Sequence, residues 1–335
     1  MSPLFTRSVG PILQPGPTPS WTSGALFNPG AWYHDGMVHL LFRAIPEGYK
    51  ITNENCDDVQ NGVPSFKNYV TSIGYACSRD GINFELRPEP FIVPDSEFDR
   101  FGAEDARISK IDDTFLITYT GLSRPLEGPI NGIRIALAST TDFKSIRKHG
   151  IVGPDVSDKD AVIFPRRIDG QIVMLHRIAP DIQLIRFDDL EELFDPPDAK
   201  WKKHMKTLDD HVIMRPEYEW EVRKIGAGPT PIETSEGWLL IYHGVDEHFV
   251  YRAGLVLLDL DNPSRVIARS SQPVLSPERE YERLGDVDNV VFPEGAVVID
   301  DMLHVYYGAA DKVIGHVSAR LSDVLLYLKK EMNPV

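Results

Sequence analysis

The hydrophobic and polar positions of this chain follow a repeating pattern. A tight turn of acidic residues and glycine is followed by a short aliphatic and aromatic run, and the unit recurs at separations of roughly 55 to 80 residues. Runs rich in Val, Ile, Phe, Tyr and Trp that follow turn residues indicate β-hairpins. The sequence therefore predicts five hairpins, with runs at 37–42, 114–119, 171–176, 238–242 and 302–306.

A strand that opens with polar or small residues precedes each hairpin. The five openings are Asn28-Pro29-Gly30, Glu104-Asp105-Ala106, Lys159-Asp160-Ala161, Lys224-Ile225-Gly226 and Pro293-Glu294-Gly295. Five such units predict an all-β fold, a five-bladed β-propeller whose innermost strands bring these openings to one axis. A β-sandwich, which would scatter the openings, is the alternative that the pattern leaves open.

We expect one catalytic propeller domain over residues 1–335, with approximate blades at 23–100, 101–157, 158–222, 223–287 and 288–325. The Asn- and Asp-rich segment 47–67 is expected to be a loop of the first blade that covers the site and sets linkage specificity. Residues 321–332 form the only segment with a convincing helix pattern, which predicts a short C-terminal helix. No chemistry is assigned to the charged segment 189–210.

The composition limits the possible partners. The net charge of -15 and the pI of about 5.1 argue against nucleic acid and against an anionic membrane surface. Two cysteines, Cys56 and Cys77, are too few for a disulfide framework. Neither a signal peptide at Met1 to Leu13 nor an apolar run of about 18 residues is evident. We expect a cytoplasmic protein with a small solute or a neutral glycan as partner, and a homo-oligomer stays open.

Charged residues of both signs gather at the strand openings and strand ends. The acids are Glu104, Asp105, Asp160, Glu294 and Asp311, and the bases are Arg43, Arg107, Lys159, Arg177, Lys224 and His243. Burying a charge costs several kcal/mol unless the charge is paired, so this concentration indicates a site for a polar substrate. A structural ion pair between Asp105 and Arg107 is the simpler alternative for that stretch. The histidines are not at metal-ligand spacing, so no metal is predicted.

This inventory separates two reactions. Glycoside hydrolysis needs an acid and a second carboxylate, whereas phosphorolysis needs an acid and cations that hold phosphate. Four cations from two neighbouring blades favour phosphate as the attacking group: Lys159, Arg177, Lys224 and His243.

Several blocks resemble glycoside hydrolase family 130, the β-mannoside phosphorylases and related β-mannosidases. The resemblance extends over 27–311 and rests on blocks in the same order, at 102–107, 159–165, 174–177, 224–229, 241–245, 289–293 and 306–311. It implies a five-bladed propeller and inverting phosphorolysis of a β-linked mannoside, of the manno-oligosaccharide or mannosyl-glucose type, to α-D-mannose 1-phosphate. Inorganic phosphate would be a co-substrate, and no cofactor is expected.

The resemblance also implies residue roles. Asp105 matches the general acid, which acts through a mannose hydroxyl. The phosphate-binding set is expected to be Lys159, Arg177, Lys224 and His243, with Asp311 nearby, and the substrate-binding set Asn28, Arg43, Glu104, Arg107, Asp160 and Glu294. Some phosphorylases of the family carry arginine followed by asparagine where this chain has Lys159-Asp160. Lysine cannot bind phosphate bidentately, and Asp160 would repel phosphate unless Lys159 neutralises it.

Two alternatives stay open at this point. One is a hydrolytic β-mannosidase in which Asp105 is the acid and Glu294 or Glu104 is the base. The other is a non-catalytic propeller that binds glycans.

Overall fold

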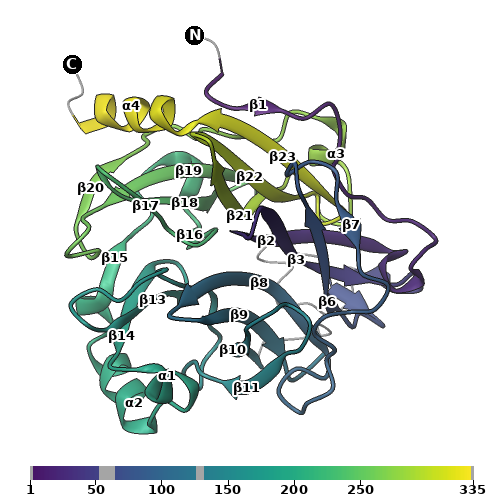
Figure 1. Ribbon diagram of the computed structural model, residues 1–335, viewed down its shortest axis with the longest axis horizontal. Helices are drawn as coiled ribbons and strands as arrows, with labels where there is room; N and C mark the ends of the chain where they lie inside the picture. Colours follow the sequence, from purple (N-terminus) through teal and green to yellow (C-terminus); the bar gives the residue numbers. More distant parts are fainter. Residues whose placement is uncertain (1–2, 53–64, 126–131, 333–335) are drawn as a thin grey trace.

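Five antiparallel sheets lie around one centre in the order of the sequence (Figure 1). The computed structural model describes residues 3–52, 65–125 and 132–332. The first strands of the blades contact one another, β2 with β8, β8 with β12, β12 with β16, and β21 with β2. The prediction of an all-β, five-bladed propeller is confirmed, and the β-sandwich alternative is wrong because the strand openings gather at the centre.

The strands of the first three blades have the following bounds. Blade one contains β2 (Ala25–His34), β3 (Met37–Ile45), β6 (Ser72–Ser78) and β7 (Glu85–Leu86). Blade two contains β8 (Gly102–Ile111), β9 (Thr114–Leu122), β10 (Ile133–Thr140) and β11 (Arg147–Ile151). Blade three contains β12 (Lys159–Ile163), β13 (Ile172–Arg177), β14 (Ile182–Phe187) and β15 (Val212–Met214).

The last two blades differ in how they are completed. Blade four contains β16 (Lys224–Ala227), β17 (Ile232–Thr234), β18 (Gly237–Val245), β19 (Tyr251–Leu258) and β20 (Val266–Arg269). Blade five contains β21 (Val291–Ile299), β22 (Met302–Ala309) and β23 (Val313–Arg320), and its outer strand is β1 (Thr6–Arg7) from the start of the chain. β1 pairs antiparallel with β23, so both ends of the chain contribute to one sheet. The sequence pattern did not predict β1.

Within the segment 47–67, β4 (Lys50–Thr52) and β5 (Ser65–Lys67) form a separate two-stranded sheet. Residues 53–64, the middle of this segment that was expected to cover the site, lie outside the described residues.

The predicted hairpins lie between the first and second strands of their blades. Their turns hold residues with positive φ, such as Asp35 (49°) with Gly36 (72°) and Asp169 (51°) with Gly170 (77°). Positive φ at both central turn positions matches the twist of the flanking strands, and Asp and Gly adopt it at low cost. The turn residues that marked the repeat therefore fix the geometry of the hairpins.

The hydrophobic core is divided among the junctions between blades. One cluster joins blades one and two around Leu41 and Ile117, and others join blades two and three, three and four, four and five, and five and one. Because both faces of each sheet pack on a neighbouring blade, the aliphatic positions of the second strands are almost wholly buried. The centre of the ring is left to polar side chains.

Helices lie on the outside of the propeller. α4 (Leu321–Met332) confirms the predicted C-terminal helix. The sequence did not predict α1 (Leu190–Phe194), α2 (Asp198–Lys206), α3 (Glu280–Arg283), or the 3-10 turns η1 (Ser20–Thr22), η3 (Leu208–His211) and η4 (Glu219–Glu221). α1 and α2 are too short to show a clear apolar period. Within the described part of the chain, no helix has the length and apolar character needed to cross a membrane.

Candidate functional site

The backbone of the innermost strands turns polar side chains toward the centre. Asn28, Asp105 and Asp160 have φ values of 51°, 56° and 55°. At each of them, and at Glu294, a register shift interrupts the pairing of the first strand with the second. Such bulges re-aim a side chain, and Asn and Asp tolerate left-handed backbone better than other non-glycine residues. The same kind of β-bulge thus places one polar side chain from each of four blades at the centre.

Asp105 is buried, with 3% of its surface exposed. Its Oδ1 accepts a hydrogen bond from Nδ2 of Asn28 (2.9 Å) and lies 3.4 Å from Nη1 of Arg43. The carboxylate of Asp105 is therefore held by residues of blade one. The simpler alternative of an ion pair between Asp105 and Arg107 is not found, because Arg107 donates to the backbone oxygen of Asp105 instead (2.8 Å).

Arg43 provides the positive charge next to Glu104 and Asp105, on the acidic side of the centre. Its Nη2 lies 2.6 Å from Oε1 of Glu104 and donates to the hydroxyl of Tyr69 (3.0 Å), while Thr71 donates to the same Oε1 (3.0 Å). Burial alone would lower the pKa of Arg43, but the charge of Glu104 raises it well above its usual range. Burial raises the pKa of Glu104, and Arg43 opposes that shift. Tyr69 and Thr71 follow the inserted segment, where no repeat marked them in the sequence.

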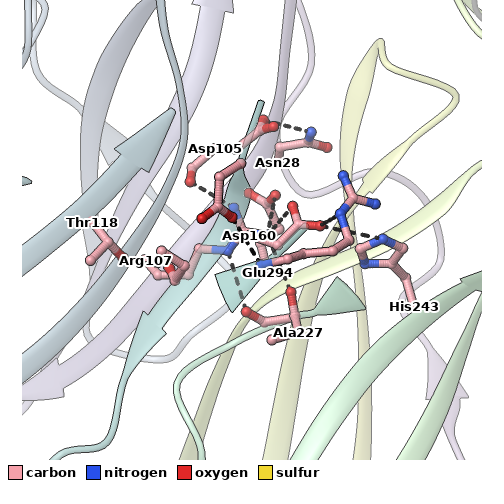
Figure 2. Close-up of polar contacts among 12 residues, drawn as sticks. Asn28, Asp105, Arg107, Thr118, Asp160, Ala227, His243 and Glu294 are labelled. Atoms are coloured by element: carbon pink, nitrogen blue, oxygen red, sulfur yellow. Dashed lines mark hydrogen bonds and ion pairs between the residues drawn. The ribbon is translucent and has the colours of Figure 1, made fainter. Parts of the chain in front are cut away.

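Arg107 lies at the centre of the ring and is 1% exposed. Its Nη2 lies 3.0 Å from Oε1 of Glu294 and 3.3 Å from Oδ1 of Asp160. Besides the carbonyl of Asp105, it donates to the backbone oxygens of Ala227 and Gly228, both at 3.3 Å (Figure 2). Every nitrogen of this guanidinium thus has a protein partner from blades two to five. The expected contact of Arg107 with substrate stays a prediction; its geometry is that of a positioning residue.

Basic side chains gather on the other side of Asp160. Nε of Arg177 lies 2.9 Å from Oδ2 of Asp160, and Nε2 of His243 lies 3.7 Å from the same oxygen (Figure 2). Burial would raise the pKa of Asp160, but Arg177, His243 and Arg107 lower it below its ordinary value. Burial lowers the pKa of His243 well below its usual range, although Asp160 opposes the shift. Asp160 is therefore a carboxylate between arginines, not one that Lys159 alone neutralises.

Lys159 and Lys224 extend the cationic side. Lys159 pairs with Arg177 across the first two strands of blade three, and Lys224 pairs with Val245 in blade four. Nζ of Lys224 lies 5.4 Å from the ring centre of Tyr251, whose ring is also 6.1 Å from that of His243. The sequence pattern did not indicate Tyr251, because the predicted site residues lie at the openings and ends of the first two strands of each blade and Tyr251 begins the third.

Two further acids lie near the centre. Asp311 follows β22 with a φ of 51°, and burial, opposed by Arg43 and reinforced by Asp105, raises its pKa to about 7. Arg43 and Asp105 are the charged groups that act on it most strongly, and its expected place beside phosphate stays a prediction. Glu294 is 1% exposed, and burial, only partly offset by Arg107, raises its pKa well above its usual range.

Unpartnered polar atoms concentrate in this cluster. With the exception of Thr52, each described residue that has a buried side-chain nitrogen or oxygen without a hydrogen bond belongs to it: Asn28, Arg43, Asp160, Arg177, His243 and Glu294. Buried polar groups are normally satisfied, so such exceptions need an explanation, and a polar ligand at the centre provides one. Across the described residues, no group of three or more His, Cys, Asp or Glu is arranged to hold a metal ion.

The fold and the site define a five-bladed propeller in which a buried carboxylate and a group of basic side chains share the centre of the ring. The chain belongs to glycoside hydrolase family 130, because the family model described as beta-1,4-mannooligosaccharide phosphorylase matches residues 18–330.

Individual relatives support this assignment over nearly the whole chain. A 1,2-beta-oligomannan phosphorylase of Thermoanaerobacter sp. (strain X514) is 38% identical over 97% of this chain and 99% of its own length. A beta-1,2-mannobiose phosphorylase of the same organism is 40% identical, over 93% of this chain and 95% of its own length. The solved structure of beta-1,2-mannobiose phosphorylase from Listeria innocua, in complex with beta-1,2-mannobiose, superposes with a TM-score of 0.79 at 29% identity. It covers 99% of this chain and all of its own.

Proposed function

We propose that this protein phosphorolyses a β-1,2-linked mannoside with inversion and releases α-D-mannose 1-phosphate. The observation that carries the proposal is the cluster of cations around Asp160, which Arg107 connects to the site of Asp105. In this proposal, Arg177, Lys224, His243 and Lys159 hold phosphate. The mannoside is bound by Asn28, Arg43, Glu104 and Asp311. Between the mannoside and the phosphate, the bottom of the site is formed by Arg107, Asp160 and Glu294.

The chemistry balances without another reactant. A phosphate oxygen attacks C1 of the mannosyl group, and the bond between C1 and the glycosidic oxygen breaks. Asp105 supplies the proton that the departing oxygen needs, either directly or through a mannose hydroxyl. Hydrogen phosphate and the mannoside thus become mannose 1-phosphate and a shortened sugar with a free hydroxyl. The proton that phosphate brings replaces the one that Asp105 gives.

The surroundings of the other acids favour phosphorolysis over hydrolysis. An inverting hydrolase needs an ionised second carboxylate to activate water. Oε1 of Glu294 lies 3.0 Å from Nη2 of Arg107, and burial raises the pKa of Glu294 although Arg107 opposes that shift. Glu104 is bound by Arg43 and Thr71. Both candidate bases are therefore engaged by an arginine of the centre, which argues against either of them activating water.

The relatives support the β-1,2 linkage. Those named for β-1,2-linked substrates are 36% to 40% identical to this chain, and one from Ruminococcus albus named for β-1,4-linked mannooligosaccharides is 35% identical. The Listeria structure holds beta-1,2-mannobiose in the same fold.

The test compares two disaccharides in two buffers. The purified protein is incubated with β-1,2-mannobiose or β-1,4-mannobiose, with and without phosphate, and mannose and mannose 1-phosphate are quantified. The proposal expects mannose 1-phosphate from the β-1,2 substrate only when phosphate is present. Equal release of mannose without phosphate would indicate a hydrolase, and binding without turnover would indicate a glycan-binding propeller.

A further inference from the structure

We propose that Asp160 makes the anion site selective for an oxyanion that carries a proton, so that phosphate and arsenate enter and sulfate is rejected. The inference rests on the proposed function, in which phosphate is the attacking group. It assigns a specificity role to a residue whose charge otherwise opposes anion binding.

Asp160 presents one carboxylate oxygen among the cations. Arg107 lies beside Oδ1, at 3.3 Å. Oδ2 lies 2.9 Å from Nε of Arg177 and 3.7 Å from Nε2 of His243, yet it makes no hydrogen bond with the described residues. The residue is 1% exposed, so bulk water does not satisfy this oxygen. Oδ2 is therefore a buried acceptor in the proposed anion site that has the charge of Arg177 beside it but receives no hydrogen bond from the described residues.

The carboxylate cannot easily move away from this position. The positive φ of Asp160 (55°) and the register shift between Lys159 and Val162 fix its backbone. A Cβ atom on Gly226, in the neighbouring innermost strand, would lie 2.4 Å from Oδ2 and 2.4 Å from the His243 ring. The absence of a side chain at Gly226 thus leaves room for the Asp160 carboxylate to lie against His243.

The chemistry of the two anions then differs. An ionised carboxylate accepts hydrogen bonds and cannot donate one. Phosphate and arsenate carry a hydroxyl at neutral pH, and this hydroxyl can donate a hydrogen bond to Oδ2 of Asp160. Sulfate is fully ionised at that pH, so it has no hydrogen to donate and is only repelled by the carboxylate. Sites built to bind a ligand hydroxyl reject analogues that lack it by up to about 10⁴- to 10⁵-fold, because their polar groups are left unpaired. The neighbouring arginines keep Asp160 ionised, as this role requires.

Asp160 also contacts Arg177, so a positioning role must be separated from a selective one. If Asp160 only orients Arg177, then Asp160→Asn weakens the binding of phosphate and the binding of sulfate by the same factor. If Asp160 selects the protonated anion, the variant loses affinity for phosphate and gains affinity for sulfate, because an asparagine can donate where the aspartate could not.

The experiment measures phosphate KM, and the inhibition constants of sulfate and arsenate against phosphate, at constant ionic strength. Titration calorimetry with phosphate and with sulfate accompanies the kinetics. For the wild type we expect sulfate to bind at least about 100-fold more weakly than phosphate, and arsenate to compete about as well as phosphate. In Asp160→Asn the ratio of the dissociation constant of sulfate to that of phosphate should fall at least about tenfold, and the variant should bind sulfate more tightly than the wild type does. Asp155→Asn, an exposed carboxylate (97%) before β12, controls for the change in net charge.

Several outcomes would overturn the inference. One is that sulfate binds to the wild type as tightly as phosphate does. Another is that the ratio of the two dissociation constants is the same in Asp160→Asn as in the wild type, because the variant loses affinity for both anions equally or for neither. Should the variant fail to fold, the wild-type comparison of sulfate with arsenate still decides. Absence of phosphate-dependent turnover would refute the proposed function instead, and the calorimetric comparison of the two anions would continue to test Asp160.

Discussion

Arg43 and Arg107 show how similar buried arginines take different tasks. Arg43 faces the carboxylates of Glu104 and Asp105 on one side of the centre. Arg107 contacts Glu294 and Asp160 and three backbone carbonyls. The first is placed to shape the surroundings of the acid, and the second holds blades two to five together beneath it. Sequence position places Arg43 in the second strand of its blade and Arg107 in the first strand of the next, but it does not show which groups each guanidinium contacts.

Asp105→Asn tests the general acid. Asparagine keeps an oxygen that can accept the hydrogen bond from Asn28, so mannoside binding should be retained while the proton is lost. We expect kcat to fall at least about 100-fold, the low end for general acid catalysis, with little change in the KM for mannoside. Steady-state phosphorolysis measures both constants. Asp113→Asn, in the exposed hairpin turn of the same blade, is the control, and wild-type turnover by Asp105→Asn would contradict the assignment.

Lys224→Ala tests the cation cluster. Loss of one charged hydrogen-bond donor is worth about 1.5–3 kcal/mol, which corresponds to a rise of about 10- to 150-fold in phosphate KM. The KM for mannoside should change little, because Nζ of Lys224 lies 5.4 Å from the ring centre of Tyr251, which stacks on His243 on the basic side of Asp160. Kinetics with each substrate varied in turn separate the two constants. An unchanged phosphate KM would show that the phosphate lies elsewhere.

Asp311 gives a pH-dependent prediction for stability. Its pKa is raised from 3.8 to about 7 in the folded state, so between these values the folded state binds more protons than the unfolded state. The free energy of unfolding therefore falls as pH rises from about 4 to about 7, by up to about 4 kcal/mol from this group. Asp311→Asn should flatten that decline in urea unfolding measured at several pH values. Asp300→Asn, exposed in the preceding hairpin turn, should not, and an unchanged slope in Asp311→Asn would contradict the shift.

At the scale of elements, the repeat could be read from sequence because its turns are local. Asp35-Gly36 and Asp169-Gly170 need no distant partner to adopt positive φ. The bulges at Asp105 and Asp160 could not be predicted, because only the pairing of two strands shows where the register shifts. The contacts of Arg107 depend on the innermost strands of four blades at once, those of blades two to five. Residue type and position in the repeat thus indicate which residues are candidates for the site. Their interaction partners can be identified only once all the blades are assembled into the ring.

Glycines let the innermost strands approach one another. A Cβ atom on Gly30 of β2 would lie 2.0 Å from the backbone oxygen of Ala106 in β8, next to Asp105. Overpacking of this kind typically costs about 1–3 kcal/mol. We expect Gly30→Ala to lower the free energy of unfolding by at least that amount and to reduce kcat, because the clash displaces the strand that carries the acid. Chemical denaturation and kinetics measure the two effects.

A matched substitution separates crowding from loss of glycine itself. Gly16 has no atom within 4 Å of its ideal Cβ, so Gly16→Ala should leave both stability and kcat nearly unchanged. Comparable behaviour of the two variants would show that the contact between β2 and β8 yields more easily than the distance implies.

At the scale of the whole molecule, the ring is closed by the start of the chain. Arg7 of β1 lies 2.9 Å from Glu282, which is fully buried and also accepts from the hydroxyl of Tyr307 (2.7 Å). Ser8 adds a hydrogen bond to His316 of β23 (2.7 Å). This junction anchors the start of the chain in blade five, and the chain then continues from β1 into blade one. Blade five supplies Asp311 and Glu294 to the site, and blade one supplies Asn28 and Arg43. Closure and the integrity of the site are therefore coupled.

Arg7→Ala would break this closure by leaving the Glu282 carboxylate buried without its cation. Removing one partner of a buried ion pair costs about 3–5 kcal/mol, a large part of the 5–15 kcal/mol that stabilises a typical domain. We expect urea unfolding to show a loss of that size and amide exchange to rise first in β1 and β23. Adding Glu282→Gln to Arg7→Ala should restore part of the stability, because the neutral amide removes the uncompensated charge. Arg320→Ala, exposed at the end of β23, should have little effect. If the double variant were less stable than Arg7→Ala, the packing of the Arg7 side chain, and not its charge, would be what holds the first and last blades together.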